Sequence, residues 1–482
     1  MKLFSRKSNG TFTRSNRVAR SELTQERGDL AYSEEWDAPQ PSHIKTDDRD
    51  LPESMLATST AAQAEDDGVP ALPTKKKQRT KRRKQKIVAR ILFVVFLLEL
   101  LYSIAVFSNI PFIKKWRDIY ISTAMNTAYH QWLATKFIPA SVIQEVLDRE
   151  EAALQAQKGL ISKWTDPHAT TPSTEPEATE PEETESPISK EEREFFELFW
   201  ELDRESWDSY LSKHPDTLKN GWENIKINEA GLDDDGTDIY TTMGEQVLAI
   251  DAKNQILIVR VKGGNYRGVL AIAKDPSRLS CHPSKSIGYY GQFAGVIAEN
   301  NNGILAMTAS GFHDPGGVGN GGSIAGYAMC DGAEYGYHMR SGYKRIELRE
   351  DDRLYITDAY LDVTPGTTDA VEFSPALIVD GVLRSDEVQA WSGIQPRASI
   401  GQSDKYEILM LVIEGRLKDS LGAPVEECAN ILLKHNCMQA MNLDGGTSAI
   451  MWYDGEYINR CSNPACPSGR PLPNAWVYAK AD

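Results

Sequence analysis

Histidine and cysteine are scarce in this sequence, which restricts the metal chemistry open to it. The 482 residues include 8 His and 6 Cys, and no Cys-x-x-Cys pair occurs. Structural zinc sites need several such ligands at close spacing, so a zinc centre is disfavoured and we expect neither metal nor cofactor. An excess of basic residues is also lacking, because the formal charge is −16 at pH 7. Nucleic-acid-binding domains are usually basic, so no nucleic-acid partner is expected.

Residues 1–73 contain no sustained apolar pattern and are rich in Ser, Thr, Asp, Glu, Gln and Arg. Such a segment buries too little apolar surface to offset the entropy lost on folding, which predicts disorder. A basic block follows, in which nine of the twelve residues from 75 to 86 are Lys or Arg. A nuclear localisation signal has the same composition. Because an apolar run comes next, we interpret residues 1–86 as a disordered basic tail on the cytoplasmic side of a membrane.

The apolar run over residues 87–110 is long enough to cross the roughly 30 Å hydrocarbon core as a helix. It starts too far from Met1 for an ordinary cleaved signal peptide. Few basic residues follow it, so the positive-inside tendency places the N-terminus in the cytoplasm and the later residues outside. The sequence therefore predicts a single-pass plasma-membrane protein that contacts membrane lipid through this transmembrane helix.

Residues 111–160 carry apolar residues at helical spacing, and Pro139 interrupts the pattern. A second helix is predicted from Ser141, a candidate N-cap, to about Gln157. The pattern indicates a membrane-proximal helical stalk, with partner binding as the alternative. Residues 161–190, rich in Pro, Thr and Glu, are typical of an extended linker. Three aromatic side chains are candidates for the lipid interface: Trp116, Tyr120 and Trp132.

Residues 191–482 have the pattern of an extracytoplasmic β-rich domain. A short helix is predicted within 191–215, and from Glu245 onward alternating and β-branched runs predict strands. A strand pair brackets the turn at Asp454–Gly455, and one late helix is predicted from Val425 to His435. We therefore expect an α+β fold, with a mixed β-rich C-terminal domain of few helices preceded by the transmembrane helix and helical stalk.

All six cysteines fall on the predicted outer side, where an oxidising environment permits disulfides. Two of them enclose a short segment, CSNPAC, that is able to close into a loop. Two others lie on a predicted helix and at its exit, where buried free thiols are the alternative. The remaining pairings stay open. The cysteines, in chain order, are Cys281, Cys330, Cys428, Cys437, Cys461 and Cys466.

Three segments punctuated by glycine are the candidates for a functional site. The first, TASGFHDPGGVGNGGSIAGY over 308–327, contains Gly311 and His313 and lacks the Gly-Lys-Ser/Thr ending of a phosphate P-loop. In the second, Arg397 and Arg416 each lie at a strand end, where a guanidinium is able to fork onto phosphate. Glu414 lies beside them, and a Glu–Arg surface ion pair is the alternative interpretation.

The third segment, AMNLDGGTSAIMWYDG over 440–455, gathers polar residues between two apolar runs. Such a cluster at a strand end is a frequent ligand-binding position, although Asp-Gly-Gly alone also fits a hairpin turn. The nearby GRPLPNAWVY adds one arginine and one asparagine. The candidate residues are Asn442, Asp444, Gly445, Gly446, Thr447 and Ser448, with Arg470 and Asn474.

NLDGGTSAIMWYDGEYIN followed by GRPLPNAWVY resembles the C-terminal signature of the phosphodiester glycosidase family. IQPRASIG and LVIEGR resemble its middle motifs and TASGF its first, in the same order, so the resemblance covers about residues 245–480. The chain departs from the family pattern at three places, where it has Ala309 for Asn, Glu414 for Asp, and GGTSA for GGGSS. The resemblance implies hydrolysis of a glycosyl phosphodiester, in exopolysaccharide or cell-envelope glycan metabolism.

Cleavage of a glycosyl phosphate passes through an oxocarbenium-like transition state and releases a phosphate. We therefore expect arginines to anchor the phosphate and carboxylates to act as base and acid. Asp444 and Glu414 are the predicted catalytic pair. The predicted substrate-binding residues are Arg397, Arg416, Arg470, Asn442, Gly445, Gly446, Thr447, Ser448, Asn474, Gly311 and His313. A non-catalytic module that binds an anionic envelope polysaccharide, and an assembly protein, are the alternatives.

Overall fold

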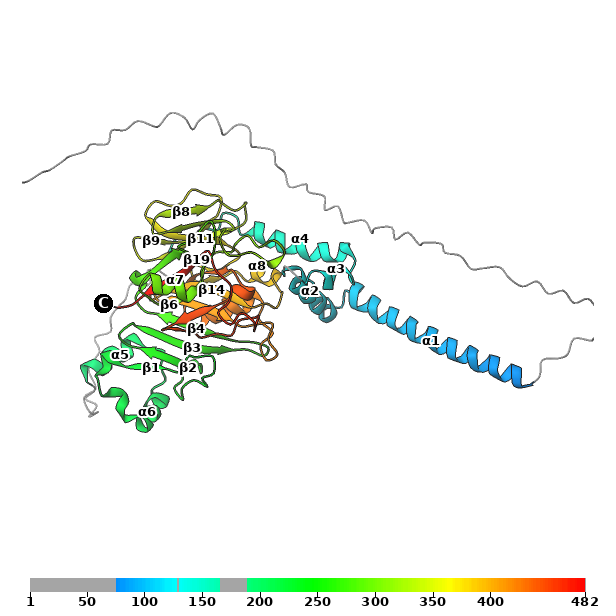
Figure 1. Cartoon of the computed structure of the whole chain (residues 1–482), viewed down its shortest axis with the longest axis horizontal. Coiled ribbons are helices and arrows are strands. Elements are labelled where there is room, and N and C mark those ends of the chain that lie inside the picture. The colour runs from blue at the N-terminus through cyan, green and yellow to red at the C-terminus, as the bar shows by residue number, and fades with distance from the viewer. Residues whose placement is uncertain (1–74, 128–129, 165–188, 482) are drawn as a thin grey trace, which may run out of the picture. The chain divides into compact units, whose positions relative to one another are not determined.

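The computed structural model of the chain describes residues 75–127, 130–164 and 189–481 (Figure 1). Two sequence predictions fall outside these ranges for most of their length. They are the disordered tail over residues 1–74 and the Pro/Thr/Glu linker over residues 165–188.

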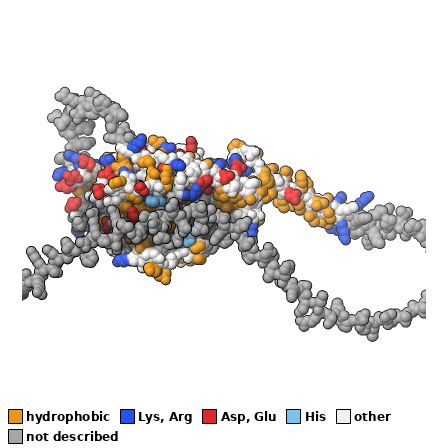
Figure 2. All heavy atoms as spheres, turned by 90° about the horizontal axis from the view of Figure 1, so that it is seen from above, with side chains coloured by type: hydrophobic (Ala, Val, Ile, Leu, Met, Phe, Trp, Pro, Cys, Tyr) orange, Lys and Arg blue, Asp and Glu red, His pale blue; other side chains and the backbone are white. Residues whose placement is uncertain are grey.

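Helix α1 runs from Lys75 to Phe107, and its part from Arg82 onward has a mean hydropathy of 2.4. By length and composition it is the one helix in the described residues that is able to cross a membrane. Figure 2 shows many hydrophobic side chains along this helix and Lys or Arg side chains toward its N-terminal end. Residues 75–86 are helical rather than part of a disordered tail. The helix also ends three residues before the predicted boundary at residue 110, because Ile110 precedes a proline and adopts an extended conformation.

Three helices follow: α2 (Pro111–Met125), α3 (Trp132–Thr135) and α4 (Ala140–Ala156). They pack around a small apolar core that includes Ile121, Ala134 and Val146. The break predicted at Pro139 is present. Pro139 is itself the N-cap of α4, so Ser141 is not the cap that the sequence suggested.

The segment after α4 lies against the β-rich domain instead of leaving it. The side-chain amide of Gln157 donates to the Ala376 carbonyl at 2.8 Å and accepts from the Ala376 N–H at 2.9 Å. The Ser162 N–H donates to the Ile356 carbonyl at 2.9 Å, and the Ile356 N–H donates to the Ser162 hydroxyl at 2.8 Å. Residues 161–164, assigned to the linker from the sequence, therefore pair with the edge of a sheet, which satisfies exposed backbone groups there.

The largest sheet has nine strands, and all neighbours in it are antiparallel. Its long strands are the alternating runs that the sequence predicted. In spatial order the strands are β1 (Lys226–Asn228), β2 (Gln246–Asp251), β3 (Ile256–Lys262), β4 (Arg267–Ala273), β15 (Ile408–Ile413), β14 (Arg397–Ser403), β16 (Cys437–Leu443), β12 (Ala376–Val379) and β13 (Val382–Leu383).

Two smaller antiparallel sheets complete the domain. The first contains, in spatial order, β10 (Leu354–Asp358), β9 (Lys344–Arg349), β11 (Thr367–Phe373), β7 (Tyr327–Cys330) and β8 (Ala333–Gly336). The second contains β18 (Glu456–Tyr457), β17 (Met451–Tyr453), β6 (Gly303–Thr308), β19 (Asn474–Ala479) and β5 (Leu279–Pro283). The predicted turn at Asp454–Gly455 joins β17 and β18.

Alternating side chains of the nine-stranded sheet fill two different cores. One face packs against the smaller sheets, as Met410 and Met441 contact a cluster that includes Trp476. The other face packs against α5 (Lys190–Leu198), α6 (Arg204–Lys213) and α9 (Val425–Lys434). Helix α7 (Ala294–Asn300) covers the outer face of the sheet that contains β6, and α8 (Ser385–Ala390) contacts α4.

The mixed, β-rich fold with few helices that the sequence predicted is confirmed. The predicted single helix in 191–215 is two helices, because the Asp203 side chain caps α6 by accepting from the Ser206 N–H at 2.8 Å.

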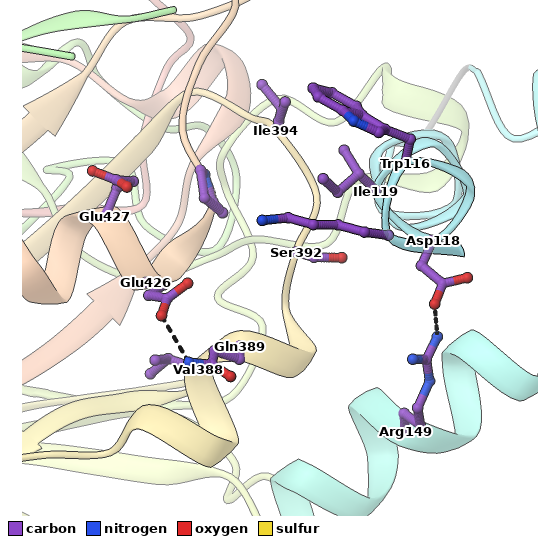
Figure 3. Close-up of a pocket in the computed structure, with 12 residues that line it drawn as sticks. Trp116, Asp118, Ile119, Arg149, Val388, Gln389, Ser392, Ile394, Glu426 and Glu427 are labelled. Carbon is purple, nitrogen blue, oxygen red and sulfur yellow. Dashed lines mark hydrogen bonds and ion pairs between the residues drawn. The ribbon is translucent and has the colours of Figure 1, made fainter. Parts of the chain in front are cut away.

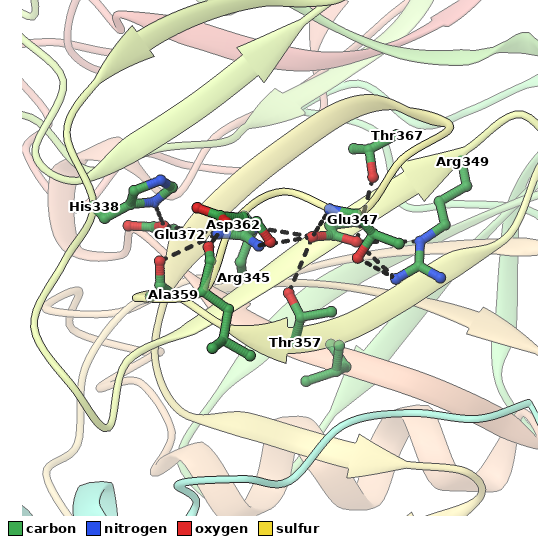
Figure 4. A network of polar contacts seen from close by, with 12 residues as sticks. His338, Arg345, Glu347, Arg349, Thr357, Ala359, Asp362, Thr367 and Glu372 are labelled. Carbon is green, nitrogen blue, oxygen red and sulfur yellow. Dashed lines mark hydrogen bonds and ion pairs between the residues drawn. The ribbon is translucent and has the colours of Figure 1, made fainter.

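The sheet that contains β9 carries a buried ion-pair network, shown in Figure 4. Arg345 is fully buried, and its Nε donates to Glu347 at 2.9 Å while its Nη groups donate to backbone carbonyls, including that of Leu361 at 2.9 Å. His338 contacts Glu372 at 2.6 Å, and burial raises the pKa of Glu372. Because the donors of the guanidinium have internal partners, this network stabilises the sheet rather than offering a ligand site.

Candidate active site

Three neighbouring strands of the large sheet bring the candidate segments to one edge. Strands β15, β14 and β16 are adjacent and antiparallel, so the start of β14 lies beside the ends of the other two. Arg397 pairs with Ile413, and Ala398 pairs with Leu443. The segments Glu414–Arg416 and Asp444–Gly446 therefore leave the sheet at the place where Arg397 enters it.

The loop after β16 lies directly against the start of β14. The Gly446 N–H donates to the Pro396 carbonyl at 3.1 Å, and a Cβ added to Gly445 would lie 2.6 Å from the same oxygen. Gly446 has φ +61°, and a Cβ added there would lie 3.5 Å from Nη1 of Arg416. Glycine at these two positions thus allows the backbone of one loop and the guanidinium of the other to approach closely.

Asp444 is the carboxylate at the centre of this loop. Burial raises its pKa to about 6, although the Ser448 side chain, the charge of Arg470 and the Gly445 N–H favour the ionised form. A carboxyl with such a pKa is mostly ionised at neutral pH and still accepts a proton readily. This pKa is compatible with the general-base part assigned to Asp444 from the sequence, and that part remains a prediction.

Arg416 and Arg397 are held in different ways. Nη2 of Arg416 donates to Oε1 of Gln395 at 2.6 Å, and the residue is otherwise exposed. Arg397 donates from Nε to the Ala423 carbonyl at 3.1 Å and from Nη2 to the Gly393 carbonyl at 2.6 Å. Burial lowers the pKa of Arg397 to about 10, which leaves it cationic at neutral pH. Arg416 is consequently the arginine better placed to contact a ligand, and Arg397 chiefly fixes the loops around it.

Arg470 ties the first glycine-rich segment to the site. Its Nη2 donates to Oδ1 of Asp314 at 2.8 Å and to the Gly319 carbonyl at 2.6 Å. Its guanidinium lies 4.5 Å from the ring centroid of Phe312. The hydrogen bond from Arg470 lowers the pKa of Asp314, so this carboxylate stays ionised and offsets part of the arginine's charge.

The other two candidates of the first segment differ in exposure. His313 is exposed and donates its N–H to the Ser323 carbonyl at 2.9 Å. Gly311 is buried, and a Cβ added there would lie 3.2 Å from the ring of Phe373. The loop thus exposes His313 to solvent. At Gly311 the missing side chain lets the loop pack closely against Phe373.

Glu414 is buried in an ion pair. It accepts from the Arg460 backbone N–H at 2.8 Å, from Nε at 2.9 Å and from Nη2 at 2.6 Å, and it is 2 % exposed. Arg267 lies 3.4 Å away, and Arg460 also contacts Asp419 at 3.0 Å. The sequence left open a surface Glu–Arg pair, whereas Glu414 is buried and its arginine partner is Arg460. The acid–base part assigned to Glu414 remains a prediction.

Both predicted asparagines connect strands. Asn474 is fully buried, accepts from the Ser310 N–H at 2.9 Å and donates to the Ser310 hydroxyl at 3.0 Å. Asn442 donates to the Ser374 carbonyl at 2.8 Å, and its Oδ1 has no hydrogen-bond partner in the described part of the chain. Thr447 lies in the loop, with its hydroxyl 3.3 Å from that of Ser462. Sugar contacts are therefore more accessible to Thr447 than to either asparagine.

The large cleft shown in Figure 3 lies beside this edge rather than on it. Its volume is about 610 Å³, and it separates α2 and Arg149 from α8, α9 and the segment Ser392–Ile394. Arg149 contacts Asp118 at 2.6 Å on one side of the cleft, and Gln389 donates to Glu426 at 2.9 Å on the other side. Asp118, Arg149 and Glu426 thus already have partners within the protein. The described ranges also hold no group of three His, Cys, Asp or Glu side chains arranged to bind a metal ion.

All six cysteines are free thiols in the structure. The Sγ atoms of Cys281 and Cys330 are buried and lie 3.5 Å apart. Cys461 is buried and Cys466 exposed, so the segment CSNPAC is not closed here.

Sequence reasoning missed Arg460, Asp314 and Gln395, which partner three of the candidate residues. Gln395 lies two residues before Arg397 and Asp314 directly follows His313, so a polar side chain beside a candidate residue was the available signal. Arg460 carries no local signal, since it lies between two motifs.

Residues 294–479 match the model of the phosphodiester glycosidase family, which is the family that the sequence motifs resemble. The SPbeta prophage-derived uncharacterized protein YomE of Bacillus subtilis is 25 % identical over 178 residues. That stretch is 35 % of this chain and 27 % of YomE, so the chain spans about a quarter of the length of this relative.

Two solved structures also resemble the chain. The first is the zebrafish N-acetylglucosamine-1-phosphodiester alpha-N-acetylglucosaminidase catalytic domain auto-inhibited by its pro-peptide. It has 18 % identity and a TM-score of 0.38, covering 47 % of this chain and 82 % of its own. The second is a hypothetical protein from Synechocystis, with 14 % identity and a TM-score of 0.34, covering 50 % of this chain and 65 % of its own.

Proposed function

We propose that residues 191–482 form an extracytoplasmic hydrolase that cleaves the glycosyl bond of a sugar-1-phosphodiester in envelope or exopolysaccharide glycan metabolism. Helix α1 anchors this hydrolase in the plasma membrane, with the N-terminus in the cytoplasm. One observation carries the proposal: Arg416, Arg397 and Asp444 meet at one sheet edge, within the stretch that matches the phosphodiester glycosidase family.

The chemistry requires a cation for the phosphate and a base for water. The exposed guanidinium of Arg416 binds the phosphate and stabilises the charge that it gains as the bond from the anomeric carbon to oxygen breaks. A water molecule forms the new bond to that carbon and transfers its proton to Asp444, whose pKa of about 6 suits this task. The products are the free sugar and a phosphate monoester, which is a good leaving group without a strong acid.

Gln395 acts as a positioning residue in this scheme. Its Oε1 accepts from Arg416 at 2.6 Å, while its Nε2 donates to the Thr123 carbonyl of α2 at 2.8 Å. The amide therefore orients the phosphate-binding guanidinium from a fixed point on the membrane-proximal helices. This contact uses one N–H group of Arg416, on Nη2. The other N–H groups of the guanidinium are left to donate to the ligand.

The test is sugar release by the purified full chain, supplied with a methyl diester of N-acetylglucosamine-1-phosphate and related sugar-1-phosphodiesters. Arg416→Met should lower kcat/KM by the equivalent of about 1.5–3 kcal/mol, the value of a charge-assisted hydrogen bond. Arg193→Met, which alters an exposed arginine on α5, is the matched control and should leave kcat/KM unchanged. Equal activity of the Arg416 variant and wild type would remove this arginine from the proposal.

A second candidate function is a non-catalytic binder of anionic envelope polysaccharide. The observation that favours it is the burial of Glu414 in its ion pair with Arg460, which engages one of the two carboxylates that the sequence assigned to catalysis. The same set of sugar-1-phosphodiesters distinguishes the two functions. A binder retains the diesters in equilibrium dialysis without releasing sugar, and the Arg416→Met variant then loses retention.

A further inference from the structure

The helices that follow α1 are fixed to its end by specific contacts. The Tyr102 hydroxyl donates to the Phe137 carbonyl at 2.8 Å, and Nη1 of Arg117 donates to the Val106 carbonyl at 2.8 Å. Val106 is 5 % exposed and belongs to the apolar core of α2, α3 and α4. Arg117 also places a cation at the C-terminus of α1, where it is favourable. The small helical bundle therefore cannot pivot freely about the end of α1.

These contacts place part of the bundle level with the apolar helix itself. Tyr102 precedes the last residue of α1, Phe107, by five positions, which is about 7.5 Å along the axis. The Phe137 backbone is bonded to Tyr102, so it lies back along α1 from the helix end. If α1 spans a bilayer, Phe137 lies at the depth of the lipid interface, where amphipathic helices bury their apolar faces about 5–10 Å deep.

The surface of the bundle around this level is aromatic. The exposed fractions are 72 % for Phe112, 57 % for Phe137, 51 % for Trp116, 47 % for Trp132 and 42 % for Tyr120. Three of these residues recur at intervals of four on α2, which puts them on one helix face. Large apolar side chains gathered on one surface indicate a binding face, and Trp and Tyr beside a membrane span are typical of the lipid interface.

We infer that Phe112, Trp116, Tyr120, Trp132 and Phe137 form an interfacial collar that is seated in the lipid headgroup layer on the C-terminal side of α1. The occupant of this surface is lipid because the collar begins five residues after α1 ends and reaches back alongside it. The inference rests on the proposed membrane crossing of α1 and goes beyond the proposed hydrolysis.

The collar also sets the height of the candidate active site. Further along α2, the Thr123 hydroxyl accepts from the Ile394 N–H at 2.9 Å, and its carbonyl accepts from Gln395. Thr123 lies eleven residues after Phe112, which is about 16 Å along the helix. The cleft in Figure 3 runs beside this stretch, with Trp116 and Ile119 facing Ile394. The site loop is thus held close to the membrane surface, within reach of a glycosyl phosphodiester that is attached to the membrane.

The experiment places nitroxide labels on the full chain reconstituted in liposomes. Cys466, the exposed cysteine, is first replaced by serine, because the other five are buried. Single cysteines are then introduced by Phe112→Cys, Phe137→Cys, Leu98→Cys on α1, and Tyr337→Cys. Tyr337 is 76 % exposed on the β-rich domain and serves as the control. Collisions with oxygen, which concentrates in lipid, are compared with collisions with a water-soluble nickel chelate.

We expect labels at Phe112 and Phe137 to lose most of the nickel broadening that the Tyr337 label shows, while oxygen broadening rises. Equal nickel access at Phe112, Phe137 and Tyr337 overturns the collar. Spin–spin broadening that persists when the lipid-to-protein ratio is raised also overturns it, because the surface then contacts a second copy. Nickel access at Leu98 means that α1 does not cross the bilayer, and the proposed anchoring fails instead. These substitutions truncate exposed side chains, so misfolding is not expected.

Discussion

Replacing Asp444 by Asn should stop sugar release and make the protein more stable at alkaline pH. Burial raises the pKa of Asp444 from 3.8 to about 6, which means that the folded protein disfavours the charged form. A pKa rise of this size lowers the free energy of unfolding by about 3 kcal/mol at a pH where Asp444 is ionised. Because the side chain is partly exposed, water screens part of this cost, and we expect about 1–2 kcal/mol.

The direction in which stability changes with pH follows from the raised pKa of Asp444. Below about pH 4 the carboxyl is protonated in both folded and unfolded chains, so Asp and Asn should give similar stability. As pH rises toward and through about 6, the unfolded chain ionises first and wild type loses stability that the Asn variant keeps. At pH 8 the variant should melt about 2–8 °C higher, given about 2–4 °C per kcal/mol for a domain of 150–250 residues.

The assay is thermal unfolding of the full chain by circular dichroism at pH 4 and pH 8, with sugar release measured on the same samples. Loss of a general base should reduce turnover by about 10²–10⁴-fold. Asp233→Asn, which neutralises an exposed carboxylate in the DDDG turn, is the matched control and should alter neither property. A variant that melts below wild type at pH 8, or one that retains turnover, refutes the role given to Asp444.

Three further changes test the surroundings of the site. Arg460→Met should cost about 2–4 kcal/mol in urea unfolding, because Glu414 is left buried without its main partner, and Glu414→Gln in the same chain should restore part of that loss. Gln395→Met should raise KM more than it lowers kcat, since the phosphate-binding guanidinium loses its acceptor; an unchanged KM argues against positioning. Mild oxidation should join Cys281 to Cys330, detected as a mass lower by two hydrogens that is absent after Cys281→Ser.

The strands and the late helix were predictable because their signals are local. β15 and β16 are short apolar runs that end in Gly-containing loops, and α9 begins and ends within one residue of its predicted bounds. The convergence of Arg397, Arg416 and the Asp444 loop was also predictable in outline, since each follows or starts a strand.

The partners within the site were not predictable, because they depend on contacts between residues far apart in the chain. Glu414 and Arg460 are separated by 46 positions and Asp314 and Arg470 by 156, and no periodicity connects them. The docking of residues 157–164 on the sheet edge has the same origin. Its hydrogen bonds are made mostly by backbone and by small polar side chains, which composition alone assigns to a linker.

Hydrolysis in ¹⁸O-labelled water is the most direct measurement of the proposed chemistry. If Asp444 directs water to the anomeric carbon while Arg416 holds the departing phosphate, the label appears in the released sugar and the phosphate monoester stays unlabelled. Label in the phosphate would show that water attacks phosphorus instead, and the assignment of this site as a phosphodiester glycosidase would then be wrong.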